Sequence, residues 1–243
     1  MIELIGIGVL RSGGGWLLRE LCTTFESGTL VVIGAAARDE RLAVLDVAAG
    51  RRIPLEGRAW IDRQPLMAET ARKVRRGIGD IDPANPLREQ RSIGWNVMEP
   101  GPGRRGLGGL LRLPRRGPRE AAADALAAVG LPGRFADPAL MLSPSDHVRV
   151  LVARALAHGH RHLLVRELDG TTSPPDTRQL LALLRALSRR RGHLVILTLA
   201  EPSLAASLAD RLLLLAAGRQ VREGQDSPRS AADLDRHLRV IRR

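Results

Sequence analysis

One short stretch near the start of the chain limits the possible folds more than any other: an apolar run, a glycine and then an amphipathic segment. The run from Leu30 to Ile33 suits a buried parallel strand, and the segment from Arg41 to Ala49 reads as a helix that ends at Gly50. Gly34 directly follows the strand. This order is the layout of a phosphate-binding loop, in which backbone N–H groups at the start of a helix hold the anion.

The residues inside this loop do not fit that chemistry. A phosphate loop of the form G-x-x-x-x-G-K-[ST] ends in a glycine, a lysine and a hydroxyl residue, whereas this chain has Asp39, Glu40 and Arg41 there. A carboxylate held about 4 Å from a phosphate oxygen costs several kcal/mol by Coulomb's law in partly screened surroundings. Lys73 is the only lysine of the chain and lies outside this loop. We therefore expect that the loop does not bind ATP tightly.

The rest of the chain alternates short apolar strands with amphipathic helices, which predicts an α/β sheet covered on both sides. We expect strands over residues 2–10, 17–25, 30–33, 58–61, 163–165, 193–199 and 212–215. We expect helices over residues 41–49, 119–129, 144–157, 176–190 and 202–210. Between residues 82 and 119, six prolines and many Gly and Arg residues predict loops and short helices in an inserted subdomain.

Composition narrows the class of protein further. The formal net charge is +12 and comes from arginines spread along the 243 residues, while aromatic residues are only 2%, so we do not expect a nucleic-acid surface. Cys22 is the single cysteine, which excludes an intrachain disulfide and a thiolate metal cluster. No signal peptide is visible and no apolar run reaches the roughly 20 residues that span a bilayer. We expect a soluble cytoplasmic chain that reaches a membrane only through a partner.

Three segments carry a resemblance to a known family. The segment 82–100, "DPANPLREQRSIGWNVMEP", keeps the D-P, a β-branched residue at Ile93 and the E-P of a stretch that follows the Q-loop in one transporter branch. The segments 130–137, "GLPGRFAD", and 209–224, "ADRLLLLAAGRQVREG", fit the same family. Over nearly its whole length the chain resembles the nucleotide-binding subunit of ABC transporters, and more narrowly it is similar to the peptide and nickel importer branch.

This resemblance implies a fold and a domain organisation. The fold is an ABC ATPase core, similar to P-loop NTPases, with an antiparallel β subdomain and an inserted α-helical subdomain. The cassette domain extends over residues 1–225, with the helical subdomain at about 84–158, and residues 226–243 form a C-terminal tail.

The resemblance also assigns residues to the motifs that bind ATP and Mg²⁺. The Walker A loop falls on Gly34 to Arg41, with Asp39 in the second glycine position, Glu40 in the lysine position and Arg41 in the Ser/Thr position that would hold Mg²⁺. Arg11 falls near the position of the aromatic residue that stacks on adenine. Ile81 falls on the Q-loop glutamine, whose side chain it cannot replace as a ligand or hydrogen-bond partner.

The remaining motifs are altered in the same way. The signature L-S-G-G-Q falls on Leu142 to Asp146, where Ser143 is retained and Pro144 and Ser145 replace the two glycines. In the Walker B position Arg166 replaces the aspartate that holds the metal, while Glu167 remains in the position of the general base. Ser173 replaces the D-loop aspartate and Ala200 replaces the switch histidine.

The scaffold positions hold while most positions that would touch ATP or Mg²⁺ have changed. The resemblance therefore implies a degenerate, non-hydrolysing cassette whose own Walker side holds no nucleotide. Such a subunit would pair with an active ABC ATPase subunit, with ATP and Mg²⁺ in the partner's site, and would couple to transmembrane permease subunits at the inner face of the cell membrane. Two alternatives stay open: an active ABC ATPase with atypical motifs that uses Glu167, and a stand-alone regulatory or nucleic-acid-binding relative.

Two other features could carry chemistry. His158, His160 and His162 could form a metal site, but no cysteine or carboxylate completes the set and we interpret them as part of a connector. The segment 101–117, "GPGRRGLGGLLRLPRRG", could bind RNA or phospholipid. In the family that the chain resembles, it would lie where the helical subdomain meets the membrane subunit, so we interpret it as a flexible basic loop.

Overall fold

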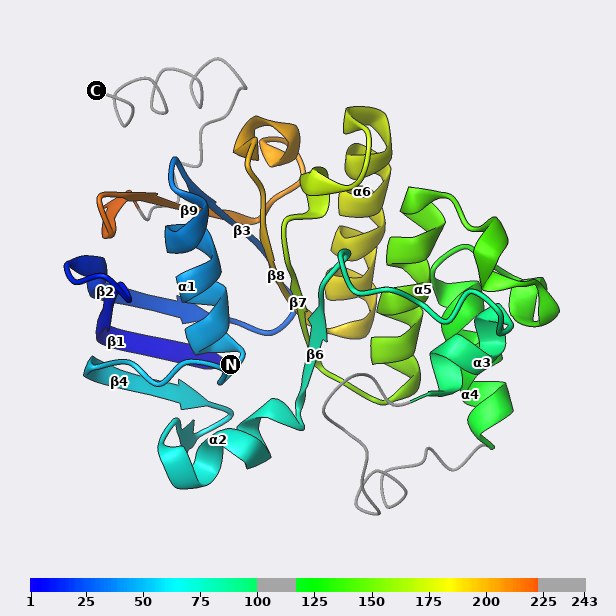
Figure 1. Ribbon diagram of the computed structural model, residues 1–243, viewed down its shortest axis with the longest axis horizontal. Helices are drawn as coiled ribbons and strands as arrows, with labels where there is room; N and C mark the ends of the chain where they lie inside the picture. Colours follow the sequence, from blue (N-terminus) through cyan, green and yellow to red (C-terminus); the bar gives the residue numbers. More distant parts are fainter. Residues whose placement is uncertain (100–116, 223–243) are drawn as a thin grey trace.

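A computed structural model of the chain describes residues 1–99 and 117–222, which form two β-sheets with helices between and around them (Figure 1). The first sheet is antiparallel and has the strand order β2-β1-β4-β5. Its strands are β1 (Ile2–Leu10), β2 (Trp16–Phe25), β4 (Glu56–Ile61) and β5 (Gln64–Pro65). It is the antiparallel β part that we expected from the resemblance.

The second sheet is the central one and has the strand order β10-β9-β3-β8-β7-β6. Its strands are β3 (Leu30–Ala35), β6 (Ile78–Ile81), β7 (His162–Val165), β8 (Leu194–Thr198), β9 (Arg211–Ala216) and β10 (Arg219–Arg222). All neighbouring strands are parallel except β9 and β10, which form a hairpin. The carboxyl ends of β3, β8 and β7 therefore meet at one edge of the sheet, where ligands bind in open α/β folds.

Six α-helices are defined in the described residues: α1 (Arg38–Ala48), α2 (Ala68–Arg75), α3 (Ile93–Met98), α4 (Pro118–Ala128), α5 (Pro144–Ala157) and α6 (Pro174–Arg191). Single 3-10 turns occur at Arg134–Ala136, Ala139–Met141, Leu168–Gly170 and Pro202–Ala205. Helices α3, α4 and α5 pack on one another beside the central sheet and form the helical part (Figure 1). No helix in the described ranges combines the length and the apolar character that a bilayer span requires.

The alternation of side chains along the central sheet divides the core into two. Val31 and Ile33 point toward α1 and the antiparallel sheet, whereas Leu30 and Val32 point toward the side covered by α5 and α6. Helix α1 thus lies between the two sheets, with most of its surface buried. This sandwiched position fixes where the first turn of α1 meets the edge of the central sheet.

Most expected elements are present, and the α/β fold class is confirmed. The expected helix over 202–210 is wrong, because only one turn forms at Pro202–Ala205 before the chain enters β9. There Asp210 accepts a hydrogen bond from the backbone N–H of Leu30 at 2.9 Å, which holds the chain extended toward the sheet. The sequence analysis missed α2, α3 and the short strands β5, β6 and β10. The 226–243 tail and the 101–116 part of the basic segment lie outside the described residues, and the domain limits 1–225 and 84–158 stay predictions.

Replacing Gly94 in α3 by alanine tests how tightly the helical part is packed. Gly→Ala usually stabilises a helix by about 0.5–1 kcal/mol, but a Cβ at Gly94 would lie 2.5 Å from carbons of the Phe135 ring. We expect Gly94→Ala to lower the free energy of unfolding by about 1–3 kcal/mol in urea titrations, as overpacked cores do. In a Phe135→Ala background the cost of Gly94→Ala should fall close to zero. If Gly94→Ala costs the same with and without the Phe135 ring, the close contact between the two residues is refuted.

Candidate functional site

Three loops meet at the carboxyl ends of β3, β7 and β8. They carry Gly34 and the first turn of α1, the pair Arg166 and Glu167, and Ala200. Gly34 is the point of closest packing, because a Cβ there would lie 2.7 Å from the ring of Pro202. The glycine is therefore required by the fold at this position, whatever the loop binds.

Arg41 and Glu167 form the central contact of this site. The Arg41 guanidinium donates to both carboxylate oxygens of Glu167, with Nε–Oε1 at 3.2 Å and Nη2–Oε2 at 3.1 Å. Its Nη1 donates to the backbone carbonyl of Ala35 at 2.6 Å, and only 5% of the Arg41 side chain is exposed. The exposed Arg38 adds a second cation, with its Nε 3.3 Å from Glu167 Oε2. Bidentate guanidinium–carboxylate pairs are among the strongest polar contacts in proteins.

The backbone of Glu167 is held as firmly as its side chain. Its φ of 40° lies in the left-handed region that a residue with a Cβ rarely adopts. The Glu167 N–H donates to Thr198 Oγ1 on β8 at 2.8 Å, which fixes the turn after β7. Both carboxylate oxygens of Glu167 therefore face cations of the protein itself, from a backbone position that strand β8 secures.

The carboxylates of Asp39 and Glu40 point to other parts of the chain. Asp39 is exposed and lies 4.0 Å from Nη1 of Arg11, which follows β1. Glu40 is buried, and its carboxylate accepts a hydrogen bond from the backbone of Gly218 in the β9–β10 turn. Burial raises the pKa of Glu40, and the Gly218 hydrogen bond and the charge of Arg11 offset this only in part. The residue in the Walker lysine position thus fastens α1 to the hairpin.

Arg166 lies beneath α1 in an ion cluster of its own. Its Nε donates to Asp80 Oδ1 on β6 at 3.0 Å and its Nη2 to Asp46 Oδ1 on α1 at 2.7 Å, while Arg51 also contacts Asp80. Only 8% of the Arg166 side chain is exposed. Burial lowers the pKa of Arg166, but the hydrogen bonds and charges of Asp80 and Asp46 outweigh it and raise that pKa. The cation that replaces the Walker B aspartate is therefore compensated within the fold.

The other predicted motif residues near this edge form hydrogen bonds with neighbouring parts of the protein. Ile81 ends β6, is buried, and accepts a hydrogen bond through its carbonyl from the Arg166 N–H at 2.9 Å. The backbone N–H groups of Ala200 and Glu201 donate to the carboxylate of Asp169 at 3.1 and 2.8 Å. Ser173 is the N-cap of α6 and accepts from the N–H of Asp176.

The signature positions lie at the start of α5. Ser143 is its N-cap and accepts from the Asp146 N–H at 3.1 Å, Pro144 occupies the first helical turn and Ser145 is buried. The carboxylate of Asp146 pairs with Arg134 at 2.8 Å and with Arg149 at 3.8 Å. Within residues 1–99 and 117–222, no hydrogen bond or ion pair joins these positions to Arg41 or Glu167. The positive end of the helix is thus already capped and faces a carboxylate.

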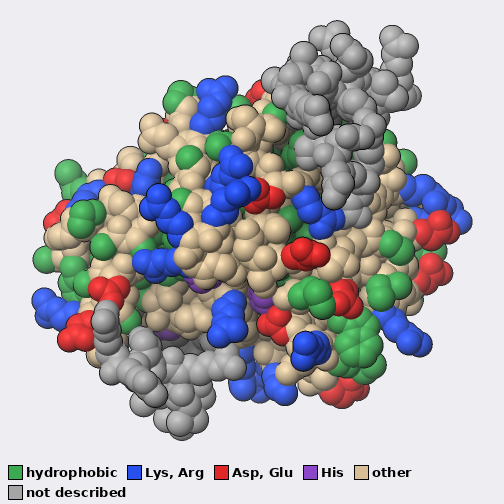
Figure 2. Space-filling model, turned by 180° about the vertical axis from the view of Figure 1, so that it is seen from behind, with side chains coloured by type: hydrophobic (Ala, Val, Ile, Leu, Met, Phe, Trp, Pro, Cys, Tyr) green, Lys and Arg blue, Asp and Glu red, His purple; other side chains and the backbone are tan. Residues whose placement is uncertain are grey.

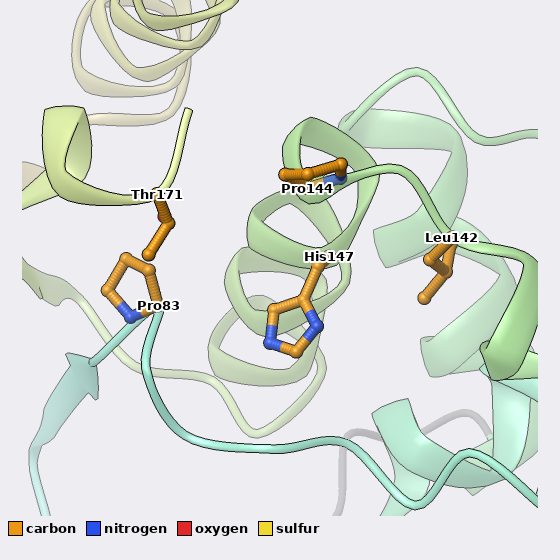
Figure 3. A pocket seen from close by; sticks show the side chains of 5 residues that line it. All are labelled: Pro83, Leu142, Pro144, His147 and Thr171. Carbon is orange, nitrogen blue, oxygen red and sulfur yellow. The ribbon is translucent and has the colours of Figure 1, made fainter. Parts of the chain in front are cut away.

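A hollow of about 310 Å³ opens beside the start of α5 (Figure 3). Pro83, Leu142 and Pro144 give it apolar walls, and His147 and Thr171 add polar groups. The Nε2 of His147 lies 3.0 Å from the carbonyl oxygen of Asn85, and burial lowers the pKa of this histidine. The hollow joins the segment after β6 to α5, away from the Arg41–Glu167 pair.

The three histidines proposed as an alternative metal site have separate surroundings. His158 Nε2 lies 3.3 Å from the carbonyl oxygen of Glu99, and His162 Nε2 lies 2.8 Å from Oδ2 of Asp62. His160 is buried near Gly79. In the part of the chain that the structure describes, no group of three or more His, Cys, Asp or Glu side chains has the arrangement of a metal site.

The sequence analysis missed the residues that complete these contacts: Arg38, Asp46, Asp80, Asp169 and Thr198. One signal was available for two of them. An arginine in a buried strand end requires carboxylates nearby, and Asp46 and Asp80 are the acidic residues of the adjoining helix and strand. The others depend on loop geometry that spacing does not encode.

The chain is similar in sequence to known proteins. No protein-family model matches the chain. It is 28% identical over 218 residues to the phosphonates import ATP-binding protein PhnC of Thiobacillus denitrificans, which covers 89% of this chain and 84% of that protein. It is also 28% identical to the methionine import ATP-binding protein MetN of Myxococcus xanthus, over 93% of this chain and 68% of that protein. A MetN from Thermobifida fusca is 31% identical over 71% of this chain and 52% of its own length.

Solved structures agree on the fold. CbiO1 of Clostridium perfringens, part of an ABC transporter complex, superposes with a TM-score of 0.81 at 19% identity, over 99% of this chain and 92% of that one. The ATP-binding cassette MJ0796, in a dimer bound to ADP and Pi, gives 0.73 at 22% identity over 92% of this chain and 98% of that one. The fold is therefore that of an ATP-binding cassette of ABC transporters, and at this level the sequence relatives support the resemblance. The narrower likeness to peptide and nickel importers stays a prediction.

Removing the buried cation at Arg166 tests how strongly it stabilises the fold through its pairs with Asp46 and Asp80. Arg166→Met would leave Asp46 and Asp80 without their shared partner, so we expect the free energy of unfolding in urea to fall by about 2–4 kcal/mol. The exposed pair of Arg219 and Glu20 provides the control, and Arg219→Met should cost less than about 1 kcal/mol. Equal costs at the two positions would contradict the buried cluster.

The buried carboxyl of Glu40 predicts a pH dependence of stability. Its pKa is raised above the ordinary 4.5, so the folded state binds the proton more tightly than the unfolded state and loses stability as pH rises through the folded pKa. Glu40→Gln removes this loss. We expect the variant to be more stable than the wild type at pH 7 and to converge with it below about pH 4.5. If the difference in thermal unfolding midpoint between the variant and the wild type is the same at about pH 4 and at about pH 7, the assignment is refuted.

Proposed function

We propose that this chain is an ATP-binding-cassette subunit of an ABC importer whose own nucleotide site does not hydrolyse ATP. The observation that carries the proposal is the bidentate pair of Arg41 and Glu167, in which a protein cation sits at the position of the Mg²⁺-binding hydroxyl and engages the remaining general base. The fold and the import proteins that the chain is similar to support the subunit class.

Metal and nucleotide chemistry support the loss of hydrolysis. In P-loop NTPases Mg²⁺ is held by a hydroxyl and a Walker B aspartate, and this chain has Arg41 and Arg166 at those two positions. Two guanidinium groups repel a divalent cation. A general base must also be able to turn toward the attacking water, whereas two hydrogen bonds from Arg41 hold both oxygens of Glu167 in place.

The proposed partners follow from this loss. A cassette that cannot turn over ATP contributes to transport only beside a subunit that can, so we propose a heterodimer with an active ABC ATPase subunit. ATP and Mg²⁺ would occupy the partner's site, and both subunits would couple to transmembrane permease subunits at the inner face of the cell membrane. No nucleic acid takes part in this proposal.

The transported cargo is a finer question. The sequence of residues 82–100 favours the peptide and nickel importer branch, whereas the named relatives import phosphonates and methionine. The chain spans about half the length of the Thermobifida fusca relative. We propose import by the peptide and nickel type of assembly, because the D-P and E-P ends of that segment are the more particular match.

Nucleotide assays on the purified chain test the central claim. We expect no binding of Mg-ATP at submillimolar concentration by calorimetry, and no phosphate release above that of the Glu167→Gln variant. The physical reason is that Glu40 and Arg41 replace the lysine and the hydroxyl that would hold phosphate and Mg²⁺, and that binding would break the Arg41–Glu167 pair. Micromolar ATP binding would overturn the claim, and phosphate release lost on Glu167→Gln would establish the active ATPase alternative.

Restoring the motif residues should raise the affinity of the chain for Mg-ATP. In the variant Asp39→Gly, Glu40→Lys, Arg41→Ser and Arg166→Asp, each ligand position regains its usual chemistry, so Mg-ATP affinity should rise at least tenfold. A control with only Asp39→Gly should stay as inactive as the wild type, because Arg41 still engages Glu167. Tight binding by the single variant would show that Arg41 is not the obstacle.

A further inference from the structure

A second charged surface lies at the opposite end of α1 from the candidate site. Gly50, just after α1, packs on the last turn of α2: a Cβ added there would lie 3.0 Å from Val74 and 3.5 Å from Arg75. Arg75 also donates to the Gly50 carbonyl at 3.5 Å. Two helix ends thus converge, and they bring six basic residues together: Arg51, Arg52, Arg72, Lys73, Arg75 and Arg76. We call these residues, with Ile53 and Met67, the α2 surface.

Few carboxylates neutralise this cluster. Asp80 pairs with Arg51 but shares its charge with Arg166. Glu69 lies one helical turn before Arg72 and Lys73 and is the single carboxylate of α2. For Arg72 and Lys73, no ion pair is formed within the ranges that the structure describes. On the face seen in Figure 2, by comparison, Lys and Arg side chains are spread among Asp and Glu.

Two large apolar side chains are exposed on the segments that carry these cations. Met67 is 53% exposed and Ile53 is 47% exposed. Ile53 follows Arg52 in the loop from α1 to β4, and Met67 is the N-cap of α2. Leu66, next to Met67, is buried and lies close to Gly50, so the segments that meet at the α1–α2 junction carry exposed apolar groups as well as cations.

The helix dipoles account for part of this arrangement. Cations in the last turn of a helix interact favourably with its negative end, and α2 has Arg72, Lys73 and Arg75 there. The dipole gives no reason for exposing Ile53 and Met67 on the segments that carry these cations. Long basic side chains around exposed aliphatic groups are what a lipid surface favours, since the cations meet phosphate while the apolar groups enter the headgroup boundary.

We propose that the α2 surface binds the anionic phospholipid headgroups of a membrane directly. The contact does not depend on the proposed function, because it uses the end of α1 that is remote from Arg41 and Glu167 (Figure 1). A nucleic acid fits less well, since the α2 surface holds no aromatic side chain on which a base could stack. Each cation near an anionic bilayer contributes roughly fivefold in affinity, so the cluster supplies a contact that salt weakens strongly.

Vesicle binding by the full chain tests this proposal. The probes are phosphatidylcholine vesicles with and without phosphatidylglycerol, measured by co-sedimentation at low and at physiological salt. We expect binding only to the vesicles that contain phosphatidylglycerol. In the variant Arg72→Glu, Lys73→Glu and Arg75→Glu this binding should fall at least tenfold, with the thermal unfolding midpoint as a check on folding.

A matched control separates the surface from the net charge of +12. Arg178, Arg190 and Arg191 are exposed on α6, and reversing all three to Glu changes the net charge by the same amount. This control should bind vesicles like the wild type. Equal loss in both variants, or absence of vesicle binding by the folded wild type, overturns the proposal. Tighter binding to RNA than to vesicles, lost in the α2 variant alone, would assign the surface to nucleic acid instead.

The apolar part of the surface has its own test. Ile53→Ser with Met67→Ser keeps every charge, so it should weaken vesicle binding several-fold while leaving the slope of binding against salt unchanged. Unchanged vesicle affinity in this variant would limit the contact to electrostatics and would refute the insertion of these side chains.

Discussion

The candidate site depends on a single buried ion pair, in which the Arg41 guanidinium faces both oxygens of Glu167. It joins the first turn of α1 to the end of β7, and through the Ala35 carbonyl it also holds the end of β3. In an ATP-binding cassette these three segments surround phosphate and metal. Here they are joined by a side chain of the protein, so the cassette architecture persists with a fixed internal cation where a ligand would otherwise supply the charge.

The second ion cluster shows how the fold accommodates an inverted charge. Arg166 replaces a carboxylate, and Asp46 and Asp80 surround it on the side of α1. A buried arginine without such partners would cost several kcal/mol, so the substitution is tolerated only together with its neighbours. The residue at the predicted Walker B position and the carboxylates that compensate its charge therefore form one cluster.

The sequence predicted much of the fold because hydrophobic periodicity is strong in the central strands and in α5, whose bounds it matched at 144–157. It failed at 202–210, where the hydrogen bond from Leu30 to Asp210 favours an extended chain over a helix. It also failed at α2, because this helix buries only Ala71 and Val74 and its other residues are mostly charged. At the site, motif spacing located Arg41 and Glu167 but not their direct contact. That contact depends on the left-handed turn at Glu167, which arises from tertiary structure and leaves no local pattern.

The chain has one lysine and one cysteine, and this has a practical consequence. Lys73 provides the only side-chain amine and is exposed on α2, while Cys22 provides the only thiol and is exposed on β2. A thiol probe can therefore be attached at Cys22 alone, and an amine probe at Lys73 once the α-amine of Met1 is blocked, without engineering any residue. A donor on one and an acceptor on the other would report how the antiparallel sheet and α2 move relative to each other when the chain meets its partners.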